Sequence, residues 1–230
     1  MRLPAPLFPG VLRRRYQRFL AEVELDDGRL VTAHTPNTGS MLQCAIPGHR
    51  VLISAADNPL RKLLWTLELI EVAGHWVDTH TLRSNRVVEE GLRSGTVPGL
   101  AGYQITPEYT VGASRIDFLL ERPGERVLVE VKNVTLCCVP GLACFPDAVT
   151  IRGQKHLREL LLARSQGYRA VIFFLVQRGE AEAFTAADAI DPVYGRLLRE
   201  VVAGGVEILA CRTCVTPAAN HLGAFLPVRL

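Results

Sequence analysis

The chain has 230 residues, of which 48% are hydrophobic and 21% are charged. This composition can fill a sizeable core and excludes a disordered or fibrous chain. The longest apolar run, residues 170–176, is far shorter than the roughly 18 to 20 residues of a membrane helix, and the N-terminal residues lack the apolar core of a signal peptide. We therefore expect a cytoplasmic protein with no membrane partner. The net charge of +3 is weaker than that of a dedicated nucleic-acid coat protein.

Lysine is rare in this chain, since 23 of the 26 basic residues are arginine. Coding bias explains most of that excess. A chain that prefers arginine so strongly keeps lysine where a compact ammonium is needed. Lys62, Lys132 and Lys155 are therefore candidates for functional positions.

Six cysteines in a chain with a full core predict reduced thiols, not a disulfide framework. Cys211 and Cys214 have the spacing of half a zinc site. The other cysteines do not supply a second pair at that spacing, so structural zinc is the weaker interpretation.

Residues 1–80 are typical of a small β-barrel. Turns are expected at residues 27–28, 47–48 and 73–74. The strand-like segments between them cover residues 11–25, 29–34, 50–54, 63–72 and 75–79. About five short strands favour an oligonucleotide-binding (OB) type of barrel, although other small barrels fit the same pattern.

Residues 81–230 alternate between strands and helices, which predicts an α/β domain with a mixed sheet. Residues 94–102 are expected to form a loop, and Ser84 or Asn85 to cap the helix before it. The expected helices are 82–92, 152–166 and 191–203, and the expected strands are 114–121, 126–134, 169–177 and 205–211. The predicted fold class is thus α/β (α+β), with a five-stranded OB-like barrel over 1–80 before a mixed-sheet domain over 81–230.

The hairpin over residues 114–134 carries the charged residues of greatest interest. A turn at 122–125 fixes its register, because a one-residue slip would scramble both faces. One face then pairs Asp117 with Glu130 and Arg115 with Lys132. The pairs expected on the opposite, apolar face are Leu120–Val127, Phe118–Val129 and Ile116–Val131.

Two carboxylates directly opposite each other repel unless a proton or a cation compensates. Oxygen ligands at this separation suit Mg²⁺ or Mn²⁺. Lys132 lies on the same face, where a lysine positions water or offsets phosphate charge beside such a metal. The alternative is that Arg115 and Lys132 only neutralise the two acids on a solvated face.

These residues carry a resemblance. Asp117, Glu130-Val131-Lys132 and the helix residues Gln154-Lys155 resemble the PD-(D/E)xK nuclease core. Longer segments resemble the sugar fermentation stimulation protein family over nearly the whole chain, namely RYQRFLA (15–21), PNTGSM (36–41), SRIDF (114–118), VEVK (129–132), FPDAVT (145–150) and RGQKHL (152–157). The resemblance implies an OB-type barrel before a nuclease-like domain, non-specific DNA binding and a regulatory role in sugar, particularly maltose, metabolism.

The nuclease pattern also implies site residues. Asp117, Glu130 and the Val131 carbonyl would hold the metal, and Lys132 would be the catalytic lysine. Gln154 and Lys155 match the helix positions that often support such a site. In many such nucleases a glutamate of the preceding helix also reaches the metal, and Glu90 matches that glutamate better than Glu89 does. Adjacent acids on a helix also form ordinary solvated faces. Asp147 is either a further ligand or a residue of the helix entry.

Basic and aromatic side chains alternate in the barrel, as they do where OB-type barrels hold nucleic acid. The aromatic residues in question, Tyr16, Phe19 and Trp65, fit a barrel core equally well. The nucleic-acid-binding candidates are Arg13, Arg14, Arg15, Arg18, Arg61 and Lys62, the loop residues Asn37, Thr38 and Ser40, and Arg115, Arg152 and His156 of the second domain. The loop is also an ordinary turn.

Two functions follow from this pattern. The first is non-specific binding of single- or double-stranded DNA with Mg²⁺- or Mn²⁺-dependent phosphodiester hydrolysis. The second is a regulatory DNA-binding protein with an idle nuclease-like site.

Overall fold

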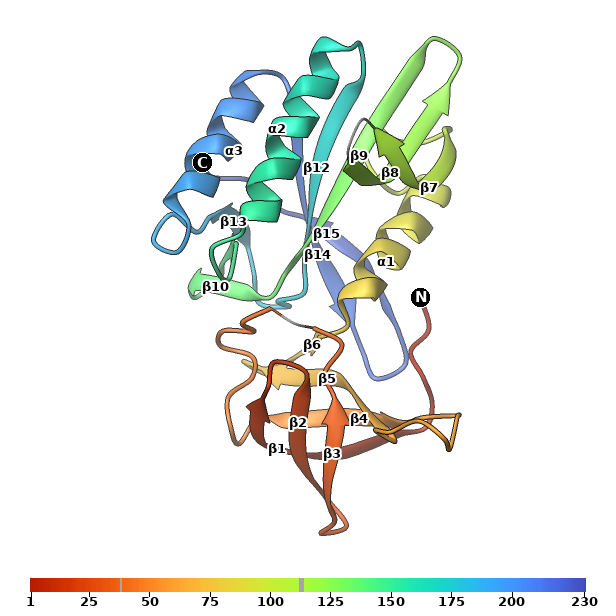
Figure 1. The fold of residues 1–230 in the computed structure, drawn as a ribbon, viewed down its shortest axis with the longest axis vertical. Helices are drawn as coiled ribbons and strands as arrows, with labels where there is room; N and C mark the ends of the chain where they lie inside the picture. The colour runs from red at the N-terminus through yellow and green to blue at the C-terminus, as the bar shows by residue number, and fades with distance from the viewer. Residues whose placement is uncertain (38, 112–113) are drawn as a thin grey trace.

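The computed structural model describes residues 1–37, 39–111 and 114–230. A β-barrel lies at one end of the long axis and a layered α/β domain at the other (Figure 1). In these residues no helix is long and apolar enough to cross a membrane.

The N-terminal sheet closes into a barrel. Its strands are β1 (Leu7–Tyr16), β2 (Leu20–Leu25), β3 (Leu30–His34), β4 (Arg50–Ala55), β5 (Trp65–Val72) and β6 (His75–Asp78). They follow the order β3-β2-β1-β4-β5-β6, and β3 also pairs with β5, so that β1 to β5 form a closed OB-like barrel. Alternate residues such as Leu12, Val23 and Ile53 point inward, which confirms the predicted fold of this part.

The prediction of one strand in the barrel is wrong. The segment predicted as a single strand over 11–25 is two strands, because the chain reverses at Gln17 and Arg18, both with positive φ. This turn lacks glycine, proline and asparagine, so it left no ordinary turn signal in the sequence. The expected turn at Ala73 and Gly74 does join β5 to β6.

The second domain is built on a mixed sheet of order β15-β14-β12-β9-β8-β7, in which β9, β12 and β14 run parallel. Helices α2 and α3 cover one face and α1 covers the other (Figure 1). The elements are α1 (Thr81–Arg93), β7 (Gln104–Val111), β8 (Ser114–Arg122), β9 (Glu125–Val134), β10 (Leu136–Val139), β11 (Leu142–Phe145), α2 (Ile151–Ser165), β12 (Arg169–Val176), β13 (Ala183–Ala186), α3 (Pro192–Ala203), β14 (Glu207–Val215) and β15 (Asn220–Phe225). This arrangement is the mixed-sheet domain predicted from the sequence.

The helix starts differ in their capping. Thr150 caps α2 and Asp191 caps α3, each accepting a backbone N–H of the first turn. Helix α1 begins after His80 without a side-chain cap, so the expected cap at Ser84 or Asn85 is wrong. Both residues lie inside the helix and bond to the hairpin strands instead.

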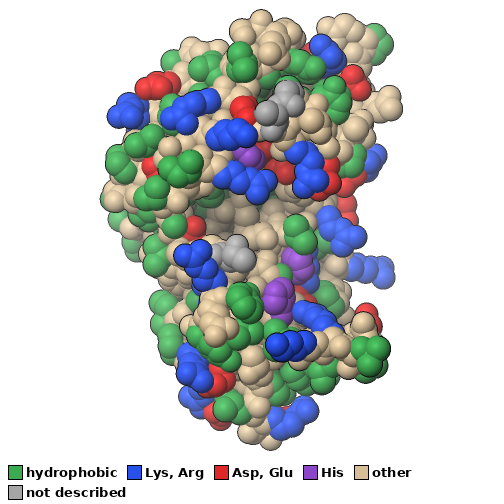
Figure 2. Space-filling view, viewed as in Figure 1, with side chains coloured by type: hydrophobic (Ala, Val, Ile, Leu, Met, Phe, Trp, Pro, Cys, Tyr) green, Lys and Arg blue, Asp and Glu red, His purple; other side chains and the backbone are tan. Residues whose placement is uncertain are grey.

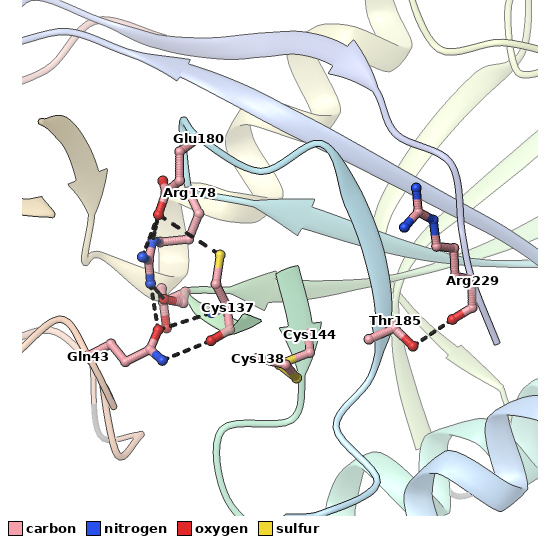
Figure 3. The surroundings of a disulfide bond; sticks show 9 residues. Gln43, Cys137, Cys138, Cys144, Arg178, Glu180, Thr185 and Arg229 are labelled. Carbon is pink, nitrogen blue, oxygen red and sulfur yellow. Dashed lines mark hydrogen bonds and ion pairs between the residues drawn. A yellow bond between two sulfur atoms is a disulfide. The ribbon is translucent and has the colours of Figure 1, made fainter. Parts of the chain in front are cut away.

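A disulfide joins Cys138 and Cys144 across β10 and β11 (Figure 3). The expectation that all thiols are reduced is therefore wrong for this pair, while the remaining cysteines carry free thiols. Cys211 is buried and Cys214 is exposed on β14. Throughout the described residues no group of three or more His, Cys, Asp or Glu side chains is placed to hold a metal, so nothing supports the zinc interpretation.

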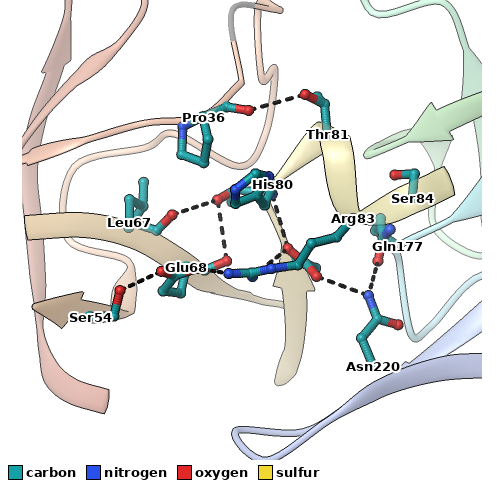
Figure 4. A network of polar contacts seen from close by, with 12 residues as sticks. Pro36, Ser54, Leu67, Glu68, His80, Thr81, Arg83, Ser84, Gln177 and Asn220 are labelled. Atoms are coloured by element: carbon teal, nitrogen blue, oxygen red, sulfur yellow. Dashed lines mark hydrogen bonds and ion pairs between the residues drawn. The ribbon is translucent and has the colours of Figure 1, made fainter. Parts of the chain in front are cut away.

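A buried ionic network joins the barrel to α1 (Figure 4). Arg83 of α1 donates to Glu68 of β5 and to Asp78 of β6, the latter at 3.2 Å. Asp78 also accepts from the Asn220 amide at 3.0 Å, and burial raises the pKa of Asp78 against the opposing effect of Arg83. One guanidinium thus compensates two carboxylates buried between the domains.

We expect Arg83→Ala to lower the free energy of unfolding by about 3–5 kcal/mol, because it leaves both carboxylates buried without their cation. Arg93→Ala is the matched control on the same helix, since Arg93 only forms an exposed pair with Glu89 and should cost about 0–1 kcal/mol. Urea unfolding of both variants measures the difference. Equal losses would show that the network contributes little.

His80 makes stability depend on pH. Burial is the main cause that lowers the pKa of His80 to about 4. The charges of Arg83, His34 and Arg86 act in the same direction, and the charge of Glu68 opposes them. An unfolded-chain histidine titrates at about 6.5, so the unfolded state binds the proton first and the fold loses stability as pH falls from about 6.5 to 4. His80→Gln should flatten the melting temperature over that window. Parallel curves for the two proteins would contradict this assignment.

Candidate functional site

The hairpin of β8 and β9 opens at the position of the charged residues. Its closed end has the predicted register, from Arg122–Glu125 to Phe118–Val129. The described pairing stops there, so Asp117 is not paired directly with Glu130 as expected. The Asp117 carboxylate instead accepts the Val131 backbone N–H at 2.7 Å.

The same opening changes the faces of β8. Phe118 packs on the α1 side of the sheet, whereas Ile116 packs in the core on the α2 side. The expected pair of Ile116 with Val131 on one apolar face is therefore wrong. The alternation of faces shifts at Asp117, which places its carboxylate at the gap between the two strands.

Asp117 is held from two sides of this gap. Its second carboxylate oxygen accepts from the Asn85 amide of α1 at 2.7 Å. The N–H and C=O of one residue point to the same edge of a strand, so the Val131 carbonyl faces the gap together with its N–H. Asp117 and Val131 thus bring oxygen atoms to the same place.

Glu130 is the buried centre of the site, with 2% of its surface exposed. Its Oε1 lies 2.6 Å from Lys132 Nζ and also contacts His156 Nδ1 of α2. Its Oε2 is buried and has no hydrogen-bond partner among the described residues. On the other side of the imidazole, Arg152 Nε lies 3.4 Å from His156 Nε2.

The two carboxyls differ in their electrostatics. Burial, together with the negative charge of Glu130, raises the pKa of Asp117 despite the hydrogen bonds from Val131 and Asn85. Burial acts in the same direction on Glu130, but His156 and Lys132 outweigh it and lower the pKa of Glu130. Glu130 is therefore the stable anion, and Asp117 is the carboxyl that gains most from an added cation.

The residues expected from helix α2 are not those that reach the site. The Gln154 amide bonds to the Asp191 carboxylate at 3.1 Å, linking α2 to the start of α3. Lys155 is exposed and lies 3.4 Å from Glu159. His156 reaches Glu130 instead. Its position four residues before Leu160, on the buried stripe of α2, is a sequence signal that could have identified it.

The two adjacent acidic residues of α1, Glu89 and Glu90, face different grooves. Glu90 forms an ion pair with the Met1 ammonium at 2.5 Å and lines a different groove from Asp117. Glu89 lines the same groove as Asp117. The structure therefore brings Glu89, not the expected Glu90, to the side of the candidate site.

Asp147 connects the two domains. Its carboxylate accepts from Ser40 Oγ at 2.8 Å and from the Met41 backbone N–H at 3.0 Å. Asp147 and Ser40 are thus engaged with each other at the interface. Thr38, another expected phosphate contact of this loop, lies outside the described residues.

The basic candidates fall into two groups. The first group is engaged within the protein: Arg13 with Glu24, Arg14 with Glu22, Arg115 with Glu108, and Arg15 with the backbone carbonyls of Asn37, Gly39 and Ser40. The buried Asn37 side chain accepts the Gly39 N–H. The second group, Arg18, Arg61, Lys62 and Arg152, forms no salt bridge within the described part of the chain. Basic side chains line both sides of the hollow between the domains (Figure 2).

The aromatic candidates of the barrel have separate surroundings. The Arg14 guanidinium lies over the Tyr16 ring, with its Cζ 4.9 Å from the centre of that ring, and Phe19 is exposed. Trp65 packs edge-on against Phe8 beside the barrel core.

The protein is therefore a two-domain protein, in which a closed OB-like barrel precedes a mixed-sheet domain. Two carboxylates and a lysine lie at the opened hairpin of the second domain. Family models confirm both parts: the SfsA N-terminal OB domain matches residues 14–78, and the sugar fermentation stimulation protein RE domain matches residues 82–219. The chain belongs to the sugar fermentation stimulation protein (SfsA) family.

Individual relatives agree with the family models. A sugar fermentation stimulation protein homolog of Syntrophotalea carbinolica is 67% identical over the full length of both chains. One of Geobacter sulfurreducens is 58% identical and covers 99% of this chain and 98% of the relative. A solved structure, described as Pyrococcus furiosus SfsA in complex with Ca²⁺, is 28% identical, has a TM-score of 0.89 and covers 100% of this chain and 98% of its own.

Proposed function

We propose that this protein binds DNA with little sequence preference and hydrolyses phosphodiester bonds with Mg²⁺ or Mn²⁺ at the opened β8–β9 hairpin. The observation that carries the proposal is the buried Glu130 Oε2, which lacks a partner among the described residues and lies in the same site as Asp117. An unsatisfied buried carboxylate oxygen is costly, and a divalent cation would satisfy it.

The donor set fits such a cation. Asp117, Glu130 and the Val131 carbonyl offer hard oxygen ligands. Each Asp117 oxygen has a lone pair to spare beyond its present hydrogen bond, and Glu130 Oε2 has no hydrogen bond among the described residues. Mg²⁺ usually takes one or two carboxylates and completes its shell with water, which suits a site without a third acidic ligand. Ca²⁺, named in the Pyrococcus structure, is also an oxygen-binding cation.

A bound cation would lower the pKa of a water molecule and offset the charge on the phosphate. The protein's own residues would do the rest. Lys132 would orient the attacking water or a phosphate oxygen from its place beside Glu130. His156 would hold Glu130 in position, and the unpaired end of the Arg152 guanidinium would contact a phosphate oxygen.

One observation favours the second function, a regulatory DNA-binding protein with an idle site. Lys132 and His156 both contact Glu130 Oε1, so that the anion is already neutralised without a metal. In that case DNA binding alone would connect the protein to sugar, particularly maltose, metabolism.

Cleavage separates the two functions. With Mg²⁺ or Mn²⁺, the wild type should cleave single-stranded DNA, duplex DNA or RNA, and Asp117→Asn and Lys132→Ala should each slow cleavage by about 10²-fold or more. Lys155→Ala is the matched control and should leave the rate unchanged, because Lys155 contacts Glu159 on the helix surface. Binding without cleavage across all substrates and both metals would favour the regulatory function.

DNA affinity should fall linearly with salt on logarithmic axes, with a slope of about −0.9 per phosphate neutralised on a duplex. Arg152→Ala should make that slope shallower by about one. Arg14→Ala should change it less, since Glu22 already pairs with Arg14. Electrophoretic or anisotropy titrations at several salt concentrations measure this, and a salt-insensitive affinity would contradict DNA binding through phosphates.

A further inference from the structure

A groove of about 850 Å³ follows one side of α1 and ends at the candidate site. His80, Arg86 and Asp117 line it, and Asn85, also in its wall, donates to Asp117. This volume lies in the range of small-ligand pockets, which is room for part of a single nucleic-acid strand.

The barrel adjoins the His80 end of the groove. At its barrel end, Thr81 next to His80 donates its N–H and its hydroxyl to the Pro36 carbonyl, at 3.4 and 3.1 Å (Figure 4). Pro36 follows β3 by two residues, and the last residue of β3, His34, pairs with Thr66 of β5.

The line then reaches the β4–β5 loop. Arg61 of this loop donates to Thr66 Oγ1 at 2.9 Å, which brings it beside His34. Burial lowers the pKa of His34, and the positive charge of Arg61 lowers it further. Arg61, His34, His80 and the α1 groove thus form a continuous line from the barrel to Asp117.

The side chains along this line match the two parts of a nucleic-acid strand. Arg61 and Arg86 form no salt bridge in the described residues and are available for phosphates. The acids of the groove are partly offset, since Glu89 pairs with Arg93 and Glu108 with Arg115. The imidazoles are uncharged at neutral pH, because burial lowers the pKa of both histidines.

We propose that this line is the path of a single DNA strand, in which Arg61 and Arg86 contact phosphates, His34 and His80 stack on bases, and Asp117 marks the end. The proposal rests on the proposed function of the same site and adds its substrate class, which is single-stranded DNA. Base stacking on aromatic rings and phosphate contacts from a basic groove are the usual means of holding single strands.

Fluorescence anisotropy with the full chain tests the path. The probes are a labelled oligothymidylate, a duplex of equal length and a single-stranded RNA, all in EDTA so that cleavage plays no part. Arg61→Ala and Arg86→Ala should each weaken single-strand binding about 5- to 10-fold and make the salt slope shallower by about 0.7. His34→Ala should weaken it about 5-fold or more, with duplex binding changed less than about 2-fold in each case.

Two arginines, one elsewhere in the barrel and one on the same helix as Arg86, serve as matched controls. Arg14→Ala lies in the barrel and Arg93→Ala on α1, and both side chains are already paired with glutamates. Melting curves show that every variant is folded. Equal losses in test and control variants, or equal losses on duplex and single strand, would overturn the path and leave the proposed function standing.

The RNA probe tests the choice of nucleic acid, since tighter binding of RNA than of DNA would contradict the assignment of DNA. A wild-type protein that binds neither single-stranded nor duplex DNA would instead refute the proposed function itself. The two failures are thus distinguishable.

Discussion

The buried contact of Arg83 with Glu68 and Asp78 is the constraint on which the arrangement of the two domains depends. Each carboxylate comes from the N-terminal sheet, and the guanidinium comes from the first turn of α1. Desolvating three charges is costly, and only their mutual neutralisation makes it tolerable. The contact therefore specifies one orientation of α1 against the barrel. Asn85 and the groove along α1 take their places from that orientation.

The candidate site depends in turn on the early end of the β8–β9 ladder. A continued ladder would bond the Val131 N–H to the backbone of β8, and the Asp117 carboxylate takes this donor instead. The sheet thus loses backbone pairing, and the Asp117 carboxylate occupies the gap, near enough to Glu130 for that charge to raise the pKa of Asp117. Such departures from regular pairing are expected where function, not stability, sets the local geometry.

The parts of the fold that could be predicted were those with a local physical cause. The Pro123-Gly124 turn and the alternation of apolar residues determine the hairpin register as far as Phe118. Beyond that point the geometry depends on α1 and β12, which sequence spacing does not describe. The turn at Gln17 and Arg18 had no local signal, since neither residue favours positive φ.

The same limit applies to the site residues. Asp117, Glu130 and Lys132 were predictable because they share one hairpin. On the helices the prediction missed by one residue: it named Glu90 and Lys155, whereas Glu89 and His156 lie on the side of the site. A step of one residue turns a helical side chain by about 100°, so sequence spacing alone does not decide between neighbours. Lysine scarcity pointed to Lys132, which lies beside Glu130 in the candidate site, and also to Lys62 and Lys155, which are exposed residues.

The construction of the groove from both domains has a thermodynamic consequence. His80 and Arg83 at its wall belong to the same short stretch that docks α1 on the barrel. A strand that occupies the groove therefore binds only the docked arrangement, and by mass action its binding energy is added to the free energy that holds the domains together. Ligand affinity and domain docking are in this sense one linked equilibrium.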